Sequence, residues 1–315
     1  MLSLEERPIP VAPPGWVLIR VRAFGLNRSE LTTRAGGSGD AVRFPRVLGI
    51  ECAGEVVDAP GTDLRRGERV IAAMGGMGRD FDGGYAQYTV VPASSAIPVQ
   101  TTLDWHRLAA IPESFGTAWG SLDMLSLDRR QSLLIRGASS SVGMAAMTIA
   151  KGRRIDVIAT TRQESKRAAL EAGGADHVVI DGGAVAAAVR EVVPEGVHGL
   201  LELVGPNACV DSLQALVPGG RACISGYLEN NWDEGVALAE AARLGVPLAH
   251  FRSSVINVTN YRHVFARLIR AVEQGTLRDT LDRTFAINEI AAAHRYMESD
   301  AACGKVVVVT PEGFD

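Results

Sequence analysis

The sequence is poor in cysteine and histidine and has no cluster of residues of the kind that binds a metal. Its four cysteines are far apart and form no CxxC pair: Cys52, Cys209, Cys223 and Cys303. Isolated cysteines mostly behave as small buried hydrophobic residues, so we expect free thiols in a reducing, cytoplasmic compartment. The six histidines form no HxxxH motif, whereas a catalytic zinc ion needs about three protein ligands. We therefore expect no metal site.

Long hydrophobic runs and a strong excess of one charge are also absent. No apolar run approaches the length that crosses a bilayer, and no basic stretch followed by an apolar run opens the chain. We expect no membrane span and no signal peptide. The net charge of -4 disfavours nucleic acid and anionic membranes as partners. With 47% hydrophobic and 22% charged residues over 315 positions, the chain is long enough for two packed domains.

Two kinds of pattern divide the chain. Short strand-like runs between glycines and prolines, at residues 17–21, 54–57, 69–72 and 85–91, indicate a β-rich domain. From about residue 132, apolar strands alternate with helical stretches, which indicates βαβ units in a doubly wound parallel sheet. The expected strands are residues 132–135, 156–160, 177–180, 199–204 and 221–225, and the expected helices are residues 142–151, 164–172, 185–192 and 208–216.

The alternation ends near residue 257. A helix at 261–274, a strand at 282–286, a helix at 290–298 and a strand at 305–310 follow. We interpret them as the chain returning to its first domain. The sequence therefore predicts a β-rich domain of residues 1–115 and 257–315, with a Rossmann domain of residues 116–256 inserted between the two parts.

A loop of small residues joins the first predicted parallel strand to the next helix. It contains Gly137, Ser139, Ser140, Ser141, Val142 and Gly143. Small residues let backbone N–H groups approach a pyrophosphate at a helix N-terminus. A serine replaces the middle glycine of the usual fingerprint, and its hydroxyl can add a donor. By itself such a loop also serves tight strand-to-helix packing, and the strand that follows favours the cofactor interpretation.

The next strand ends without the acid that binds the ribose 2′-hydroxyl of NAD. It ends at Thr161, and Arg162, Ser165 and Lys166 follow. Two cations with hydroxyl donors suit a 2′-phosphate, because guanidinium and ammonium groups pair strongly with phosphate. The alternative is that these cations are solvated charges at a helix start. We favour NADPH as the cofactor.

A series of short motifs, in the same order along the chain, resembles the zinc-free quinone oxidoreductases of the medium-chain dehydrogenase/reductase superfamily. These are the zeta-crystallin-like proteins. The resemblance covers essentially the whole chain. It rests on residues 17–27 followed by Ser29 and Glu30, LGIECAG at 48–54, GERV at 67–70, GGYA at 83–86, GTAW at 116–119, the loop at 137–143, PGGR at 218–221 and GKVV at 304–307.

This resemblance implies a GroES-like catalytic domain, a Rossmann domain and a homodimer paired through Rossmann strands. Zinc-dependent relatives have a cysteine at the position of Asn27 and a histidine at the position of Ile50, and the loop that holds a structural zinc is absent here. Without a Lewis acid, reduction of simple ketones loses its main electrostatic aid. Quinones and α,β-unsaturated carbonyl compounds (enones) remain suitable hydride acceptors, because the developing charge is delocalised onto oxygen.

The resemblance also implies roles for individual residues. Asn27 would lie near the nicotinamide, Thr117 beside its ribose, and Arg43 could steer an anionic acceptor. The alternatives are that Asn27 only hydrogen-bonds the backbone of a turn and that Arg43 is simply solvated. Glu51 is expected to pair with a buried cation rather than to act as an acid. The remaining expected cofactor contacts come from Val204, Ser225, Gly226, Phe251, Arg252 and Lys305. No tyrosine lies in residues 36–45, so the proton donor is unassigned.

Three functions remain open at this point. The first is an NADPH-dependent quinone or enone reductase, the second is an enoyl-thioester or polyketide tailoring reductase, and the third is a non-catalytic NADPH-binding protein, which the fold permits. Relatives also open with an additional strand before the segment that matches residues 4–10. We expect either a shortened N-terminus or a reorganised edge of the first domain.

Overall fold

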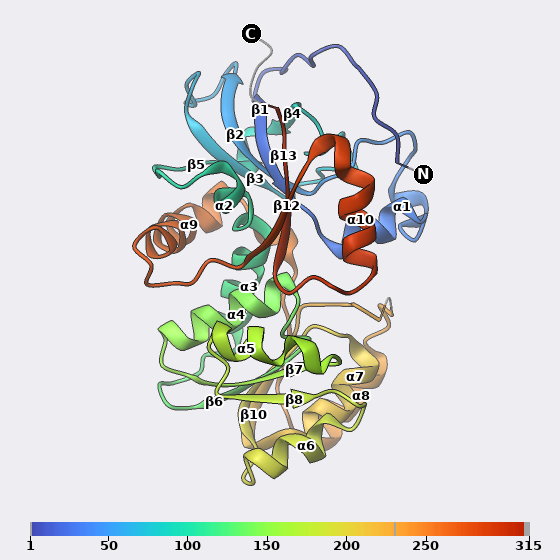
Figure 1. The fold of residues 1–315 in the computed structure, drawn as a ribbon, viewed down its shortest axis with the longest axis vertical. Helices are drawn as coiled ribbons and strands as arrows, with labels where there is room; N and C mark the ends of the chain where they lie inside the picture. The colour runs from blue at the N-terminus through green and yellow to red at the C-terminus, as the bar shows by residue number, and fades with distance from the viewer. Residues whose placement is uncertain (1, 230, 312–315) are drawn as a thin grey trace. The chain divides into compact units, whose positions relative to one another are not determined.

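The computed structural model describes residues 2–229 and 231–311, and the chain divides into two compact units (Figure 1). The first unit runs to Gly116 and resumes at Ser253, and the second is Thr117–Arg252. The boundaries expected from the sequence, after residues 115 and 256, lie one and four residues away.

A mixed seven-stranded sheet forms the body of the first unit, in the order β12-β13-β1-β2-β3-β5 with β4 also paired to β1. Its strands are β1 (Trp16–Gly25), β2 (Glu51–Asp58), β3 (Arg69–Ala73), β4 (Tyr88–Pro92), β5 (Ala96–Pro98), β12 (Leu281–Ala286) and β13 (Lys305–Val309). Strand β13 pairs antiparallel with β1 from Ala23 to Gly25. The last strands of the chain therefore complete the sheet that the first strand begins.

The core of this unit follows from the period of two along β1. Val17, Ile19 and Val21 point to one face and are at most 1% exposed. On the opposite side of this core lies α10 (Ile290–Glu298), which contributes Ile290, Ala293 and Met297 at helical spacing and lies beside β12 and β13 (Figure 1). The other helices of this unit are α1 (Arg28–Arg34), α2 (Trp105–Ala109) and α9 (Val258–Glu273), with α3 (Pro112–Leu125) crossing the boundary between the units.

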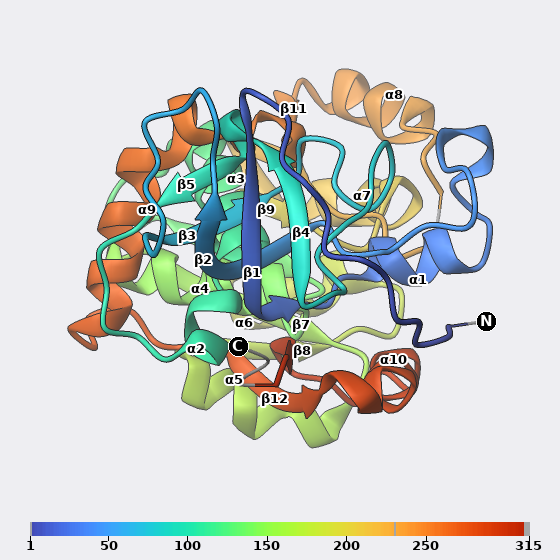
Figure 2. The ribbon, with the colours of Figure 1, turned by 90° about the horizontal axis from the view of Figure 1, so that it is seen from above.

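Strand β4 lies at an edge of the sheet. Among the described residues it pairs with β1 alone. Residues 2–13 form neither helix nor strand, and Figure 2 shows this dark blue segment running past β1 and β4. The edge of the first unit therefore has an irregular segment where another strand could pair.

The second unit is a six-stranded parallel sheet in the order β11-β10-β9-β6-β7-β8. Its strands are β6 (Ser132–Arg136), β7 (Asp156–Thr161), β8 (His177–Ile180), β9 (Val197–Glu202), β10 (Leu216–Ile224) and β11 (Leu248–His250). Helices α4 and α5 contact each other and β6 to β8, whereas α6, α7 and α8 form a second contacting group. The sheet is doubly wound, which confirms the predicted fold class.

The helices of this unit are α4 (Ser141–Gly152), α5 (Arg167–Gly173), α6 (Val185–Val192), α7 (Pro206–Ser212) and α8 (Gly235–Leu244). The helix expected over 208–216 was too long. It ends at Ser212, a 3-10 turn covers Leu213–Ala215, and β10 already begins at Leu216. Gly219 has a positive φ of 81°, so the first residues of β10 do not follow a regular strand. The sequence therefore predicted this strand only from residue 221.

Candidate functional site

The loop after β6 has the geometry of a phosphate-binding turn. Gly137 adopts a φ of +82°, a conformation that side chains with a Cβ rarely tolerate. The Ser140 hydroxyl donates to the Gly137 carbonyl at 2.8 Å and accepts from the Gly143 backbone N–H at 3.1 Å. Ser140 is thus the N-cap of α4, and its hydroxyl closes the turn. The expected additional donor to phosphate is therefore not available from Ser140.

Gly143 is required by close packing. A Cβ at this position would lie 2.6 Å from both the Cα and the carbonyl oxygen of Ala138. The first turn of α4 therefore sits directly on the loop backbone. The backbone N–H groups of Ser139, Ser141 and Val142 have no hydrogen-bond partner within the described chain. These unpaired donors at a helix N-terminus fit the phosphates of a dinucleotide.

The loop lies where the strand order of the second sheet reverses. Strand β6 is flanked by β7 on one side and β9 on the other, and ligands of doubly wound sheets bind at such a switch point. Gly137 donates its N–H to the Thr160 hydroxyl at 3.1 Å. On the other side, a Cβ on Gly137 would lie 3.4 Å from Val204. Val204 therefore adjoins the loop.

The end of β7 carries positive charge. Arg162 and Ser165 are exposed and Lys166 is buried. Glu164, the acid between them, forms an ion pair with Arg167 at 2.5 Å. The acid that ends the neighbouring strand, Asp181, is bound by Arg136 at 2.8 Å. The Glu164 and Asp181 carboxylates are therefore each bound by another arginine.

The remaining predicted cofactor contacts lie at the same carboxyl edge or close to it. Strand β10 ends before Ser225 and Gly226, and β11 ends before Phe251 and Arg252. Phe251 is buried, and its N–H donates to the Ile224 carbonyl at 3.0 Å. Arg252 is exposed. Thr117 lies on α3, is 2% exposed, and its carbonyl accepts from the Ser121 hydroxyl at 2.6 Å; that hydroxyl also contacts the Ser225 hydroxyl at 2.6 Å.

Sequence reasoning missed a buried ionic network beneath the loop. Arg136, the last residue of β6, is 4% exposed and pairs with Asp181 at 2.8 Å and Asp211 at 3.2 Å. It also donates to the Ala208 carbonyl and the Ser212 hydroxyl. An arginine directly before the glycine of a phosphate loop, in an otherwise apolar strand, was the available signal. Arg136 therefore connects the end of β6 with the residue after β8 and with α7.

Glu202 belongs to the same network at the end of β9. It is fully buried and accepts hydrogen bonds from the Val204 N–H and the Ser212 hydroxyl, both at 2.8 Å. Burial raises the pKa of Glu202 to about 7, although Arg136 opposes this shift. Burial likewise raises the pKa of Glu30 in the first unit to about 7. Each carboxyl is therefore more easily protonated in the folded protein than in the unfolded chain.

These shifts predict a pH dependence of stability. Between the unfolded value of 4.5 and the folded value of about 7, the folded state binds more protons, so the free energy of unfolding falls as the pH rises through this window. Urea unfolding of Glu202→Gln, measured at intervals from pH 5 to 8, should show a weaker decline than the parent protein. The exposed Glu171→Gln serves as the control. An unchanged slope in Glu202→Gln would contradict the assignment.

A second buried polar cluster lies in the first unit. The Lys305 ammonium is 2.5 Å from Glu51 Oε1 and 3.5 Å from Glu113 Oε2, and it donates to Asn27 Oδ1 at 2.6 Å. The Asn27 amide nitrogen donates to Glu51 at 3.0 Å and to Glu30 at 3.3 Å. Lys305 and Glu51 are both fully buried. The expectation that Glu51 pairs with a buried cation is confirmed, and Lys305 is that cation.

This bonding bears on two of the predicted roles. Both hydrogens of the Asn27 amide are donated to carboxylates, so neither is left to orient a carboxamide or an acceptor carbonyl. The Lys305 ammonium is enclosed by its partners and has no exposed surface. Both predicted roles would require the cluster to rearrange. Arg43 is exposed and makes no hydrogen bond or ion pair within the described chain.

The structure bears on the other sequence-based expectations as well. Every cysteine is a free thiol, and burial raises the pKa of Cys52, Cys209 and Cys223. Over residues 2–229 and 231–311, no group of three or more histidine, cysteine, aspartate or glutamate side chains could hold a metal ion. The helices in this part of the chain include none long and apolar enough to span a membrane.

Two family models match the chain. The model described as an alcohol dehydrogenase GroES-like domain matches residues 13–101, and the model described as a zinc-binding dehydrogenase matches residues 173–308. The chain is 28% identical to prostaglandin reductase-3 from Mus musculus, over 98% of this chain and 84% of that protein. It is 27% identical to quinone oxidoreductase from Homo sapiens, over 96% and 91% of the two chains.

Other similarities concern a longer protein and solved structures. The chain is 29% identical to a part of polyketide synthase GfsB from Streptomyces halstedii; the match covers 96% of this chain and 5% of the synthase. The structure of AibC superposes with a TM-score of 0.85 at 27% identity, over 98% of this chain and 91% of that one. A mycobacterial protein solved with NADPH shares the fold, with a TM-score of 0.85 at 21% identity over 97% and 94% of the chains.

The same assignment follows from the two matched family models and from the sheet orders of the two units. Members of the matched family are oxidoreductases that bind nicotinamide cofactors. The chain is therefore a member of the medium-chain dehydrogenase/reductase superfamily.

Proposed function

We propose that the protein is a zinc-independent, NADPH-dependent reductase that transfers hydride to a quinone or an α,β-unsaturated carbonyl compound. The observation that carries this proposal is the anion site at the start of α4, with its three unpaired N–H groups and with Arg162 and Lys166 at the end of the adjacent strand. The prostaglandin reductase and quinone oxidoreductase relatives support the acceptor class.

The choice of NADPH rests on charge at the end of β7. Thr161 ends this strand, so no carboxylate is present there to accept hydrogen bonds from a ribose 2′-hydroxyl. The Glu164 carboxylate pairs with Arg167, which reduces its competition for Arg162 and Lys166. A 2′-phosphate would form charge-assisted hydrogen bonds with these cations.

Zinc independence rests on the residues present in the first unit. Ile50 has no donor atom, the amide hydrogens of Asn27 are donated to Glu51 and Glu30, and the Lys305 ammonium lies among the carboxylates. This residue set does not fit a catalytic zinc ion, although one matching family model is described as zinc-binding. Conjugated acceptors suit such a site, because their developing negative charge is delocalised.

The residues of the second unit would bind and orient the cofactor. The N–H groups of Ser139, Ser141 and Val142 would hold the pyrophosphate, while Arg162, Ser165 and Lys166 would hold the 2′-phosphate. Thr117, Val204, Ser225 and Gly226 would position the nicotinamide half at the edge of the sheet. The bound cofactor supplies the hydride.

The open edge of the second sheet supports a homodimer, which is part of the proposal. Strand β11 has β10 as its one partner within the described chain. Nearby, α8 exposes Val236 and Leu238, which are 46% and 47% exposed. Pairing of β11 with a second copy would cover an open sheet edge.

Cofactor selectivity tests the central claim. Arg162→Ala and Lys166→Ala should each weaken NADPH binding about 10- to 100-fold, because each removes a charged hydrogen-bond donor, while NADH binding changes little. Both dissociation constants can be measured by titration of nucleotide fluorescence. Arg243→Ala is the control, because this exposed arginine lies on α8 and pairs there with Glu240 at 2.7 Å. Equal losses for NADPH and NADH would contradict the 2′-phosphate site.

Turnover tests the reaction. We expect loss of NADPH absorbance with 9,10-phenanthrenequinone or a simple enone. Turnover of enoyl thioesters alone would instead favour the tailoring reductase suggested by the similarity to part of GfsB. Binding without turnover of any of these acceptors would favour a non-catalytic NADPH-binding protein.

A further inference from the structure

The edge of β4 presents unpaired backbone groups in a fixed register. Val21 donates its N–H to the Gln87 carbonyl at 2.8 Å, and Ala93 donates to the Gly15 carbonyl at 3.0 Å. In an antiparallel pair every second residue bonds to the partner strand. Residues 87, 89, 91 and 93 therefore bond to β1, and the N–H groups of Tyr88 and Val90 point away from it.

The irregular N-terminal segment flanks this edge without pairing to it. No backbone hydrogen bond joins described residues 2–12 to residues 86–92. Pro8, Pro10 and Pro13 have no N–H to donate. Leu2 at the start of the segment packs against the core and Ala12 near its end is buried. Between them, the Arg7 guanidinium is 3.3 Å from the Asp82 carboxylate, and these side chains are 41% and 49% exposed. Exposed pairs of this kind contribute about 0–1 kcal/mol, so the middle of the segment is held only weakly beside the strand.

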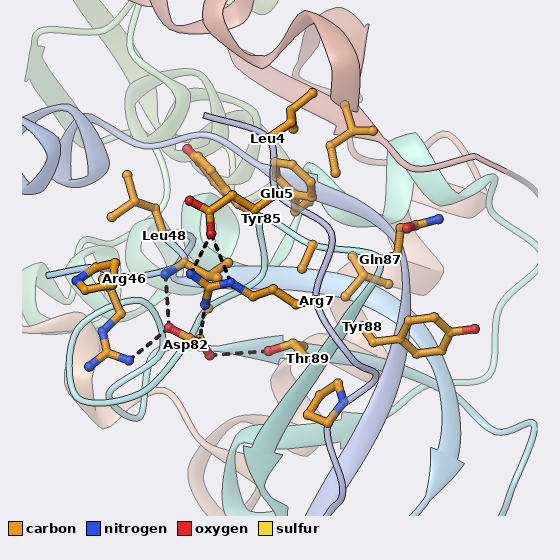
Figure 3. A pocket seen from close by; sticks show the side chains of 18 of the residues that line it. Leu4, Glu5, Arg7, Arg46, Leu48, Asp82, Tyr85, Gln87, Tyr88 and Thr89 are labelled. Atoms are coloured by element: carbon orange, nitrogen blue, oxygen red, sulfur yellow. Dashed lines mark hydrogen bonds and ion pairs between the residues drawn. The ribbon is translucent and has the colours of Figure 1, made fainter. Parts of the chain in front are cut away.

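A pocket of about 1530 Å³ lies between this segment and the strand. Figure 3 shows Leu4, Glu5 and Arg7 of the segment together with Gln87, Tyr88 and Thr89 of the strand region around it. Ligand pockets for small molecules measure about 300–1,000 Å³, so this one has room for a larger occupant. Residues 2–10 of the segment and residues 87–90 of the strand region line it, and residues 44–48 of the same unit complete part of its wall.

The pocket is also lined by a cation that makes no ion pair within the described chain. Arg20 lines it, directly opposite Tyr88 of β4 on one side and Glu55 of β2 on the other. The Glu55 carboxylate is bound by Arg22 at 2.8 Å. Arg20 is half-buried and makes no hydrogen bond or ion pair within the described chain. Arg46, which also lines the pocket, is paired with Asp82 at 2.9 Å. Arg20 is therefore the group that would attract an acidic side chain.

We propose that β4 and this pocket form a docking site for an extended peptide segment of a partner protein that carries an acidic side chain. The segment adds as a strand to β4, accepts hydrogen bonds from the N–H groups of Tyr88 and Val90, and places its carboxylate at Arg20. Strand addition of this kind takes its affinity from main-chain hydrogen bonds and its specificity from alternate side chains. The first unit alone supplies the site, which is independent of the proposed cofactor specificity.

Two matched synthetic peptides test this site on the full-length protein. The probes are TVTETVT and TVTKTVT, both acetylated and amidated, which differ in the charge of the central residue. We expect the glutamate peptide to shift the Tyr88 and Val90 amide resonances and to slow their hydrogen exchange, and the lysine peptide to bind at least about tenfold more weakly. Absence of these changes with the glutamate peptide at millimolar concentration would overturn the proposal, as would equal binding of the two peptides.

Two substitutions separate the backbone from the charge. Val90→Pro removes an N–H that faces away from β1, so the pairing of β4 with β1 is retained. We expect this variant to bind the glutamate peptide about tenfold more weakly than Val90→Ala does. Arg20→Gln should abolish the preference for the glutamate peptide over the lysine peptide. Retained preference in Arg20→Gln, or equal affinity in the two Val90 variants, would contradict the geometry.

Discussion

Replacing Lys305 with methionine is expected to lower the free energy of unfolding by about 3–5 kcal/mol, since removal of one partner leaves a buried charge uncompensated. Glu51 lies 2.5 Å from the Lys305 ammonium, and both side chains are fully buried. The neighbouring Glu113 and Asn27 would lose the same partner. Urea unfolding followed by circular dichroism measures the effect.

A surface lysine provides the control for this prediction. Lys151 pairs with Asp176 at 2.7 Å, but the two side chains are 34% and 37% exposed. Lys151→Met should therefore cost less than about 1 kcal/mol. Comparable losses in the two variants would mean that burial does not determine the contribution of Lys305, and the cluster would have to be reinterpreted.

Replacing Gly143 with alanine is expected to weaken NADPH binding at least about tenfold, because overpacking at this position costs about 1–3 kcal/mol and displaces the helix start. A Cβ would lie 2.6 Å from the Ala138 backbone, which cannot move as a side-chain end could. The displacement would carry the N–H groups of Ser141 and Val142 away from the phosphates. Fluorescence titration with NADPH measures the loss.

Gly182 is the matched position for this test. A Cβ there would meet no atom within 4 Å, so Gly182→Ala should leave NADPH affinity unchanged within about twofold and stability within about 0.5 kcal/mol. Tight NADPH binding by a folded Gly143→Ala protein would show that the start of α4 is not the phosphate site.

The periodic part of the fold could be predicted from the sequence. Strand β8 and helices α6 and α10 begin and end where the sequence placed them, at His177–Ile180, Val185–Val192 and Ile290–Glu298. Alternating apolar residues and helical spacing are local properties, so one sequence suffices to recognise them. Helix α3 was not predicted, because Gly116 in its sequence favours a loop. The structure shows that this glycine serves close packing, since a Cβ there would lie 2.8 Å from Ile256.

Local sequence also indicated the loop that we propose as the cofactor site, because its small residues lie in a continuous run from Gly137 to Gly143. It did not show that the Ser140 hydroxyl would close the turn. The buried ionic clusters could not be predicted from the sequence. Asn27, Glu51 and Lys305 are separated by up to 278 residues, and Arg136 is 75 residues from Asp211; no local pattern connects them.

The sequence by itself determined the two-domain architecture, the run of small residues that we propose as the phosphate loop, and the absence of a cysteine or histidine where zinc-dependent relatives have them. Tertiary structure alone decided the partners of each buried charge and the open edge of β4. The physical reason is that a strand, a helix and a turn are selected by neighbouring residues, whereas a buried charge or an edge N–H depends on which distant segment the fold brings beside it.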